Sequence, residues 1–387
     1  MITPCDAVRH ALHVHTTKDL GALGHTATCS GAHALAWGPN GTIVDEVEGY
    51  AQLMPNTRYM QEHTQPVFDL ASVTKSLVTA TLAMRAISKG WIDWSTPVVE
   101  VFPRWGAVEP DNGATLLHLL NHSSGLPAWH KFYLDCDFDL DAVGFAQQRA
   151  QIVDSVLTWP RHPVPGEVYA YSDLGYIALC ALLEAVYATH TGMQRALDVI
   201  AQDVIFGPLE MHDTCFVSAL RGHPPITEAI ATEWCDHRQR VVVGEVHDEN
   251  TFVMGGVSGH AGAFSTAHDL LRFARHMLEI DQGTARNGLV SQEVLHRAWS
   301  PQSMAPGGHH VAGWDTPSGE STSVGRGADR ANTVGHLGFT GTSLWIDRAR
   351  QEVVILLTNR VHPTRENPRI FSMRVDVHEA IWPPQNA

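Results

Sequence analysis

Lysine is scarce in this chain of 387 residues. The sequence contains four lysines, Lys18, Lys75, Lys89 and Lys131. Nearly all of its basic side chains are therefore arginine. The formal net charge is −15, and no basic run is interleaved with aromatic residues. Because proteins hold nucleic acids with clustered basic side chains, we expect no nucleic-acid partner. The scarcity also makes any lysine inside a motif conspicuous.

Long apolar runs are missing as well. The two longest, at about 77–87 and 177–188, are interrupted by Arg85 and Glu184 and are too short to cross a bilayer. The N-terminal segment contains His, Asp and Arg without a continuous apolar stretch, so it does not read as a signal peptide. We therefore expect no membrane span and a cytoplasmic location, or a periplasmic one if the N-terminus was trimmed.

Metal-binding and disulfide patterns are also lacking. The six cysteines are scattered without close pairs, which favours free thiols over disulfides. Histidine is abundant, at 24 residues, but no H-E-x-x-H or C-x-x-C spacing occurs. We expect no metal site.

Strand signals lie near the two ends of the chain, and helix signals lie between them. Residues 34–38 and 42–47 flank an Asn-Gly turn, and residues 343–346 and 353–358 form a second predicted hairpin. The predicted helices are 4–20, 72–89, 116–121, 171–187, 193–206, 266–280, 291–299 and 369–381. Residues 305–335 are rich in Gly, Ser and Pro and predict a loop.

This order predicts an α+β fold with two lobes in a single domain of residues 1–387. Strands from both chain ends most simply pair into one antiparallel sheet. The sheet lobe would take residues of about 1–70 and 305–387, and an interleaved, mostly helical lobe would take about 71–304. A cleft between the lobes is the expected place for a site.

The strongest chemical signal is Ser72-Val-Thr-Lys75 at the start of an apolar helix. Residues three apart share one face of a helix, so the Ser72 hydroxyl and the Lys75 ammonium would meet. A desolvated lysine can take the proton of a serine and make it a nucleophile. Serine is also a common N-cap, so the pair alone leaves a structural role open.

Three further stretches could complete such a site. Tyr171-Ser-Asp173 offers a phenol that a nearby cation would help to ionise, although a tyrosine at a helix start usually packs. His336-Leu-Gly338-Phe339 precedes a strand, and the backbone N–H of Phe339 could join that of Ser72 in an oxyanion hole. Gly244 to Asn250, taken alone, could be an acidic surface loop.

Together these stretches resemble the serine β-lactamase and penicillin-binding-protein superfamily, in particular its class C and esterase-like branch. Ser72-Val-Thr-Lys75, Tyr171-Ser-Asp173 and His336-Leu-Gly338 match its three motifs in order. His122-Ser-Ser-Gly-Leu-Pro127 looks like the H-T-S-G-L-P segment of that family, and the resemblance covers about residues 30–385. The segments 244–250, 256–265 and 313–318 look like one subgroup, the β-lactamase-related serine hydrolases or low-molecular-mass penicillin-binding proteins.

The resemblance implies a β-lactamase/transpeptidase-like fold and a reaction through an acyl-enzyme on Ser72. Lys75 and Tyr171 would share the acid–base work, and the N–H groups of Ser72 and Phe339 would hold the oxyanion. No metal or organic cofactor is implied. The expected substrate-binding residues are Asp173, His336, Gly338 and Asn250. The expected partner is a small ester, amide or peptidoglycan-derived molecule, with the oligomeric state left open.

Two departures from the family pattern bear on the substrate. The lysine of the third motif, which anchors a substrate carboxylate in the family, is His336, an imidazole that is mostly neutral at pH 7. The asparagine of the second motif is Asp173, which should hold Lys75 protonated and shift the base role toward Tyr171. Both changes predict a weak grip on anionic amides.

We therefore expect a hydrolase of esters or of small amides and peptides. The first alternative is a D-alanyl-D-alanine carboxypeptidase or penicillin-binding protein with weak β-lactamase activity. The second, of another class, is a non-catalytic ligand-binding protein on the same fold.

Labelling Ser72 distinguishes the enzyme from the binding protein. A fluorophosphonate or a penicillin should add once to the wild type and not to Ser72→Ala, because the serine hydroxyl is the acylated group. Intact mass measures the adduct, and turnover of p-nitrophenyl acetate should be lost in the same variant. An adduct that persists in Ser72→Ala would refute the assignment, and equal turnover by both proteins would favour a binding role.

Overall fold

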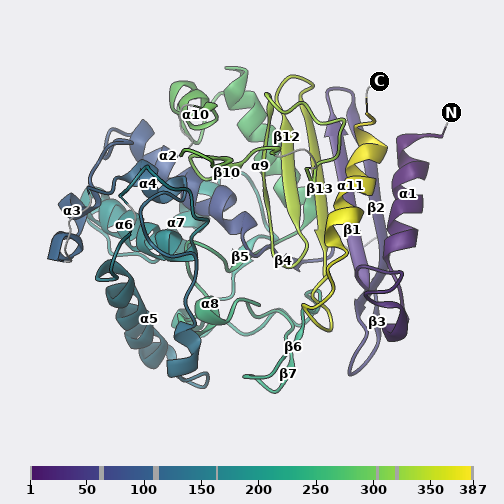
Figure 1. The fold of residues 1–387 in the computed structure, drawn as a ribbon, viewed down its shortest axis with the longest axis horizontal. Helices are drawn as coiled ribbons and strands as arrows, with labels where there is room; N and C mark the ends of the chain where they lie inside the picture. The colour runs from purple at the N-terminus through teal and green to yellow at the C-terminus, as the bar shows by residue number, and fades with distance from the viewer. Residues whose placement is uncertain are drawn as a thin grey trace.

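Strands from both chain ends form one antiparallel sheet in the computed structural model, which describes residues 2–60, 65–107, 113–162, 164–301, 305–318 and 322–384 (Figure 1). The strand order is β3-β2-β1-β13-β12-β11-β10-β9, and Ala32 of β1 pairs with Thr358 of β13. The strands are β1 (Gly31–Gly38), β2 (Gly41–Gln52), β3 (Arg58–Tyr59), β9 (His310–Val311), β10 (Trp314–Asp315), β11 (Thr333–Leu337), β12 (Ser343–Asp347) and β13 (Glu352–Thr358).

Two smaller sheets lie outside the large one. They consist of β4 (Phe68–Asp69), β8 (Ala263–Ser265) and β5 (Cys215–Phe216), and of β6 (Trp234–Cys235) with β7 (Arg240–Val241). The pairing of β4 with β8 is the one that matters for the site, because Ser72 follows β4 directly.

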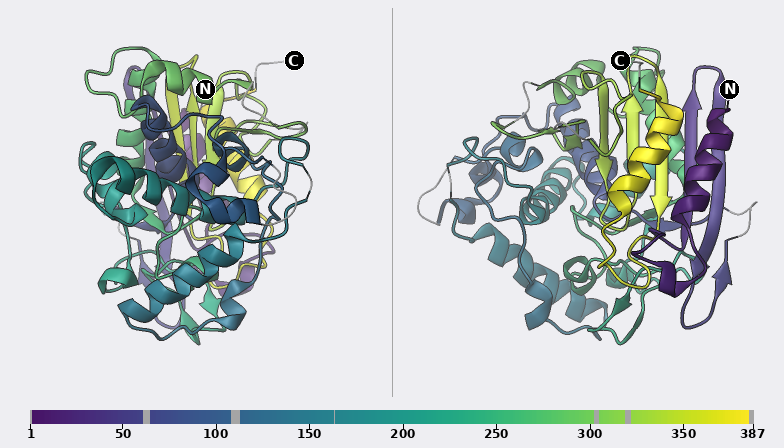
Figure 2. Two further views of the ribbon diagram at one scale, coloured as in Figure 1. Left: turned by 90° about the vertical axis from the view of Figure 1, so that its left-hand side faces the viewer. Right: turned by 45° about the vertical axis from the view of Figure 1, so that its right-hand side comes forward.

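Helices cover both faces of the large sheet and fill the second lobe (Figures 1 and 2). The helices are α1 (Pro4–His15), α2 (Thr81–Ser88), α3 (Val98–Val101), α4 (Leu116–Leu120), α5 (Ala142–Leu157), α6 (Asp173–Thr191), α7 (Leu197–Ala201), α8 (Glu249–Val253), α9 (Ala267–Asp281), α10 (Gln292–Ala298) and α11 (Ile370–Ile381). Helices α1 and α11 pack together on one face, and α9 packs against β1, β12 and β13.

The side-chain alternation of β1 explains this layering. Ala32, Ala34 and Ala36 are small and face the core beneath α1 and α11, whereas Leu35 belongs to the larger core shared with α9. Because successive residues of a strand point to opposite faces, a strand covered on both sides is buried along its length. We expected the helical lobe to extend to about residue 304, but α9 covers the sheet.

Helix α6 is the centre of the helical lobe. Its first turn is capped by the Ser172 hydroxyl, which accepts the N–H of Gly175, and most of its residues are buried. It is the one helix of the described chain that is long and apolar enough to cross a membrane, yet 67% of the apolar stretch is buried in the protein. That burial is what a core helix requires.

Two predictions about local structure were wrong. Residues 305–335 were expected to be a loop, but β9 and β10 lie within them and extend the sheet beyond β11, with Asp315 opposite Gly335. The first helix ends at His15 rather than near residue 20, and the next two residues are both threonine, which is β-branched and favours extended backbone. All six cysteines are free thiols, as their spacing predicted.

Docking of α9 on the sheet should dominate local stability. Leu270→Ala removes a side chain that is 0% exposed, so the free energy of unfolding should fall by about 2–5 kcal/mol. Leu271→Ala, next to it and only partly buried, is the matched control and should cost clearly less. Urea denaturation of both variants measures the difference, and equal losses would contradict the assignment of the buried face.

Candidate active site

Ser72 sits in a tight turn between β4 and a helical segment that begins as a wide π-helical turn, Lys75–Ala80, and continues as α2. The residue before it, Ala71, has φ +46°, a left-handed conformation that is costly for a residue with a Cβ. Its N–H donates to Asp69 Oδ1 at 2.8 Å, which holds the turn in place. The nucleophile is therefore fixed by its backbone.

Lys75 is fully buried and lies among three oxygen atoms. Its Nζ is 2.8 Å from Ser72 Oγ, 2.7 Å from Asp173 Oδ1 and 3.2 Å from the carbonyl oxygen of His260. Burial opposes the charged form, but Asp173 and Tyr171 outweigh it and raise the pKa of Lys75 above its usual value. Lys75 is thus an ammonium at rest and needs a partner to act as a base.

Tyr171 is that partner. Lys75 Nζ lies 4.7 Å from the centroid of its ring, and the phenol hydrogen-bonds Lys75 and Ser72. Burial raises the pKa of Tyr171, while the Lys75 ammonium pulls it back in part. Because the two groups interact this closely, they titrate as a pair, and loss of one proton from the pair creates the base that Ser72 needs.

Imidazole rings pack behind Tyr171. The ring of His122 lies 4.4 Å from that of Tyr171, and His310 and His336 lie 5.4 and 6.3 Å from it between centroids. His310 contacts the phenol of Tyr169, whose hydroxyl is 2.8 Å from His310 Nδ1. Burial lowers the pKa of His122 and of His310, so this wall of the site is uncharged.

His336 belongs to this wall and does not line the pocket, contrary to our expectation. It is 2% exposed, and its Nδ1–H donates to the carbonyl of Leu337 at 2.8 Å. Burial, together with the Lys75 charge, lowers the pKa of His336 to about 3. The ring is therefore neutral at pH 7, and it is not placed to anchor a substrate carboxylate because it does not line the pocket.

Asn250 was also expected to bind substrate, but it does not line the pocket. It is 1% exposed in α8, where its Oδ1 accepts the N–H of Tyr133 and its Nδ2 donates to the carbonyl of His130 at 2.8 Å. An amide that satisfies two backbone groups of a loop is a structural residue. Asn250 holds the segment next to Trp129, which lines the pocket.

The backbone N–H groups of Ser72 and Phe339 are placed for an oxyanion hole. Within the described part of the chain neither N–H has a hydrogen-bond partner. Thr340 Oγ1 donates to the carbonyl of Asp69, and Thr342 Oγ1 donates to that of Leu70, so the two segments are tied side by side. Two free N–H donors that converge next to a nucleophile would stabilise a tetrahedral intermediate, which makes this pair the candidate oxyanion hole.

Gly338 is required by the same close approach. A Cβ at this position would collide with Thr342 Oγ1 and with the carbonyl oxygen of Leu70. The glycine therefore lets the β11 edge lie against the Ser72 turn. The structure brings Ser72, Lys75, Tyr171, Asp173, Gly338 and Phe339 together and leaves His336 and Asn250 outside.

The pocket has a volume of about 520 Å³ and contains three arginines that the sequence did not reveal. Arg365 pairs with Glu233 and Glu249. Arg360 donates from Nε to the carbonyl of Phe339 at 2.7 Å, and Arg374 donates from Nη2 to the carbonyl of Gly338 at 2.9 Å.

Arg360 and Arg374 differ from Arg365 in having no counter-ion. Both are at least 91% buried, and in the described residues no carboxylate lies within 4 Å of either guanidinium. Burial lowers the pKa of both, that of Arg374 to about 9. One sequence signal could have indicated that Arg374 is buried. It lies beside Met373 and one turn before Val377, on the apolar side of the last helix.

A family model described as Beta-lactamase matches residues 18–377 of this chain. The chain belongs to the Beta-lactamase family. It is a serine hydrolase, and its fold is the β-lactamase/transpeptidase fold that the three motifs predicted.

Two relatives in sequence and one solved structure illustrate what the chain is similar to. The N-acetylmuramyl-L-alanine amidase of Bacillus subtilis (strain 168) is 30% identical over 330 residues, covering 80% of this chain and 72% of the relative. A Salmonella typhimurium protein, provisionally named a D-alanyl-D-alanine carboxypeptidase, is 26% identical over 355 residues, covering 86% and 79%. The structure of simvastatin synthase (LovD) from Aspergillus terreus superposes with a TM-score of 0.70 at 17% identity, covering 99% and 98%.

Replacing Asp173 should move the pH at which activity appears. Asp173 raises the pKa of both Lys75 and Tyr171, so Asp173→Asn should lower both and shift the acidic limb of kcat/KM to lower pH by about one unit or more. Ester hydrolysis across a pH series measures the shift. The exposed Asp139→Asn is the control, and an unmoved limb in Asp173→Asn would contradict this account of the base.

Proposed function

We propose that this hydrolase cleaves small peptide, amide or ester substrates that carry a carboxylate near the scissile carbonyl, as peptidoglycan-derived peptides do. The observation that carries the proposal is the pair of buried arginines, Arg360 and Arg374, without a protein counter-ion beside the oxyanion hole.

The energetics of these guanidinium groups favour an anionic ligand. Burying a charge without a partner costs free energy, and folding has already removed water from these two guanidinium groups. An anion that binds them supplies the missing partner and recovers part of that free energy. Arginine also presents several N–H donors in a fixed plane that suits a carboxylate. Some N–H groups of Arg360 and Arg374 donate to backbone carbonyls, and these hydrogen bonds fix the orientation of the remaining N–H donors.

The position of the arginines fixes where the carboxylate would lie. Arg360 hydrogen-bonds the carbonyl of Phe339, whose N–H belongs to the oxyanion hole. A carboxylate held there is close to the carbonyl that Ser72 attacks. A pocket of about 520 Å³ admits a small molecule of this kind.

The reaction follows from the same geometry. The Ser72 oxygen adds to the carbonyl carbon while its proton passes to the Lys75–Tyr171 pair, and the N–H groups of Ser72 and Phe339 hold the oxyanion. The pair then returns the proton to the leaving amine or alcohol. Water attacks the acyl-enzyme by the same proton exchange and frees the acid and Ser72.

The names of two relatives support this substrate class. One is an amidase of N-acetylmuramyl-L-alanine, and the other bears the name of a carboxypeptidase for D-alanyl-D-alanine, whose substrate ends in a carboxylate. Uncharged esters are the second candidate, because Trp129, Phe339 and Ile370 give the pocket apolar walls.

Substrate pairs that differ only in the carboxylate test the proposal. In Arg374→Met, the ratio of kcat/KM for a D-alanyl-D-alanine peptide to that for its C-terminal amide should fall about 10- to 100-fold, because a charge-assisted hydrogen bond is lost. Arg360→Met should act in the same direction. Taking the ratio cancels any general damage to the strand that both arginines support.

Arg365→Met is the matched control, since this arginine also lines the pocket but is compensated by Glu233 and Glu249. Its substrate ratio should stay near that of the wild type. If the wild type already prefers the amide or an uncharged ester, the substrate class is wrong, while acylation of Ser72 would still stand.

A further inference from the structure

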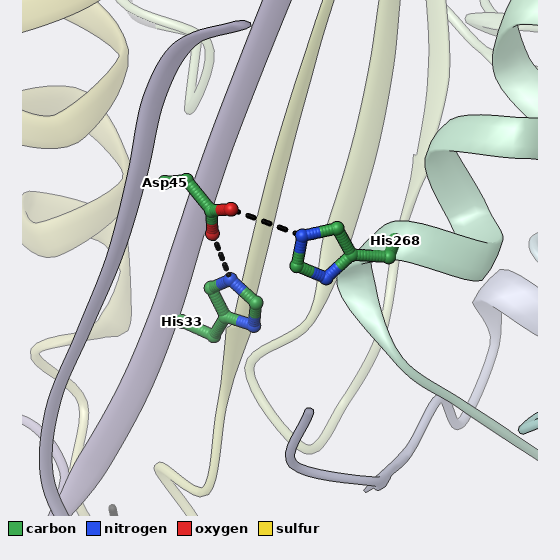
Figure 3. A group of neighbouring side chains, drawn as sticks. All are labelled: His33, Asp45 and His268. Carbon is green, nitrogen blue, oxygen red and sulfur yellow. Dashed lines mark hydrogen bonds and ion pairs between the residues drawn. The ribbon is translucent and has the colours of Figure 1, made fainter. Parts of the chain in front are cut away.

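A second cluster of polar side chains lies on the sheet, outside the residues that line the pocket. His33 belongs to β1, Asp45 to β2 and His268 to the first turn of α9, and Figure 3 shows the carboxylate between the two imidazole rings. Asp45 Oδ1 is 2.8 Å from His33 Nε2, and Asp45 Oδ2 is 3.0 Å from His268 Nε2. The ring centroids are 5.6 Å apart.

The fold itself brings these three side chains together. Leu35 lies opposite Asp45 in the β1–β2 hairpin, and His33 shares the face of Leu35, which α9 covers. Thr266 caps α9 and starts the helix so that His268 reaches this face. The cluster is therefore fixed by a hairpin and a capped helix rather than by flexible loops.

We propose that His33, Asp45 and His268 form a binding site for a divalent transition-metal ion of the zinc class. Two imidazole nitrogens and one carboxylate oxygen are the donor set that zinc and its neighbours prefer, whereas calcium and magnesium prefer oxygen alone. One donor atom from each residue lies within 4.8 Å of the others. Each imidazole directs Nε2 at the same carboxylate, so an ion between them would replace the two shared protons.

The burial of the cluster leaves room for a complete coordination shell. The His33 side chain is 1% exposed, whereas those of Asp45 and His268 are 39% and 36% exposed. Zinc ligands lie about 2.0–2.2 Å from the ion, so the donor atoms of a tetrahedral site lie about 3.4 Å apart. The two imidazole nitrogens must therefore approach each other from a separation within 4.8 Å, which the partial exposure of His268 allows. The open side is left for water as the fourth ligand.

A second group, His309, His310 and Asp315, is less suited to a cation. His309 Nδ1 already bonds Asp315, and His310 Nδ1 bonds the Tyr169 hydroxyl. His310 also lies within the electrostatic reach of the Lys75 ammonium, which repels a cation. The first cluster has no such neighbour among the groups that act on Asp45.

An ion at the first cluster would fasten α9 to the β1–β2 hairpin. It would join α9 to two strands that already pair with each other, so its effect is on stability and not on the reaction at Ser72. The Nδ1 atoms of His33 and His268 have no hydrogen-bond partner in the described chain. Because such partners usually strengthen a metal site 10- to 100-fold, we expect an exchangeable ion that a chelator removes.

Zinc titration of chelator-treated protein tests the site. Calorimetry should show one equivalent bound to the wild type, and the melting temperature should rise with Zn²⁺. Asp45→Asn and His268→Ala change the two partly exposed ligands and leave buried His33 intact, so both variants should fold. Each should bind Zn²⁺ at least about tenfold more weakly and lose the thermal shift.

His13→Ala is the matched control, because exposed His13 pairs with Glu48 of β2 without a second histidine. It should bind Zn²⁺ as the wild type does, and ester turnover should be the same with and without chelator. Absence of binding and of a thermal shift in the wild type would overturn the proposal. So would unchanged binding in both Asp45→Asn and His268→Ala, which would place the metal elsewhere, such as at His309, His310 and Asp315.

Discussion

The buried ammonium of Lys75 is the constraint on which the site depends. A charge with no exposure to water must be compensated where it lies, and Asp173, Ser72 and the carbonyl of His260 do so. These groups come from the N-terminus of α6, the nucleophile turn and the segment before β8. Compensation of one charge therefore fixes the relative positions of three parts of the chain that must meet for catalysis.

The arginines of the pocket show the opposite arrangement. Arg360 and Arg374 are both buried, and their guanidinium groups hydrogen-bond backbone carbonyls rather than carboxylates within the described residues. The protein thus separates two roles for positive charge. Lys75 is compensated within the protein by Asp173, whereas the two guanidinium groups have no carboxylate partner among the described residues, which is the feature on which the proposed anionic substrate rests. The scarcity of lysine in the sequence fits this division, since arginine keeps its charge when buried.

The sequence predicted the sheet and the main helices from local spacing, and its motifs named Ser72, Lys75 and Tyr171, which the structure brings together. His336 was expected to line the pocket, but its motif position does not indicate how deeply the side chain is buried. Asn250 was expected to bind substrate, but its side-chain amide hydrogen-bonds the backbone of the neighbouring segment at His130 and Tyr133. Arg360 and Arg374 were missed because they reach the pocket by tertiary packing, Arg360 from the segment after β13 and Arg374 from α11. Strands β9 and β10 are too short for any periodicity to show.

The threonine hydrogen bonds that tie the segment around Phe339 to the segment before Ser72 have a consequence for folding. Thr340 reaches Asp69 across 271 residues of sequence, and β1 pairs with β13 over a similar separation. Contacts between such distant segments close the longest loops and form late along most folding routes. Acylation of Ser72 should therefore appear only when the last strands have docked. Covalent labelling of this serine would then report the completion of folding, not merely the presence of the enzyme.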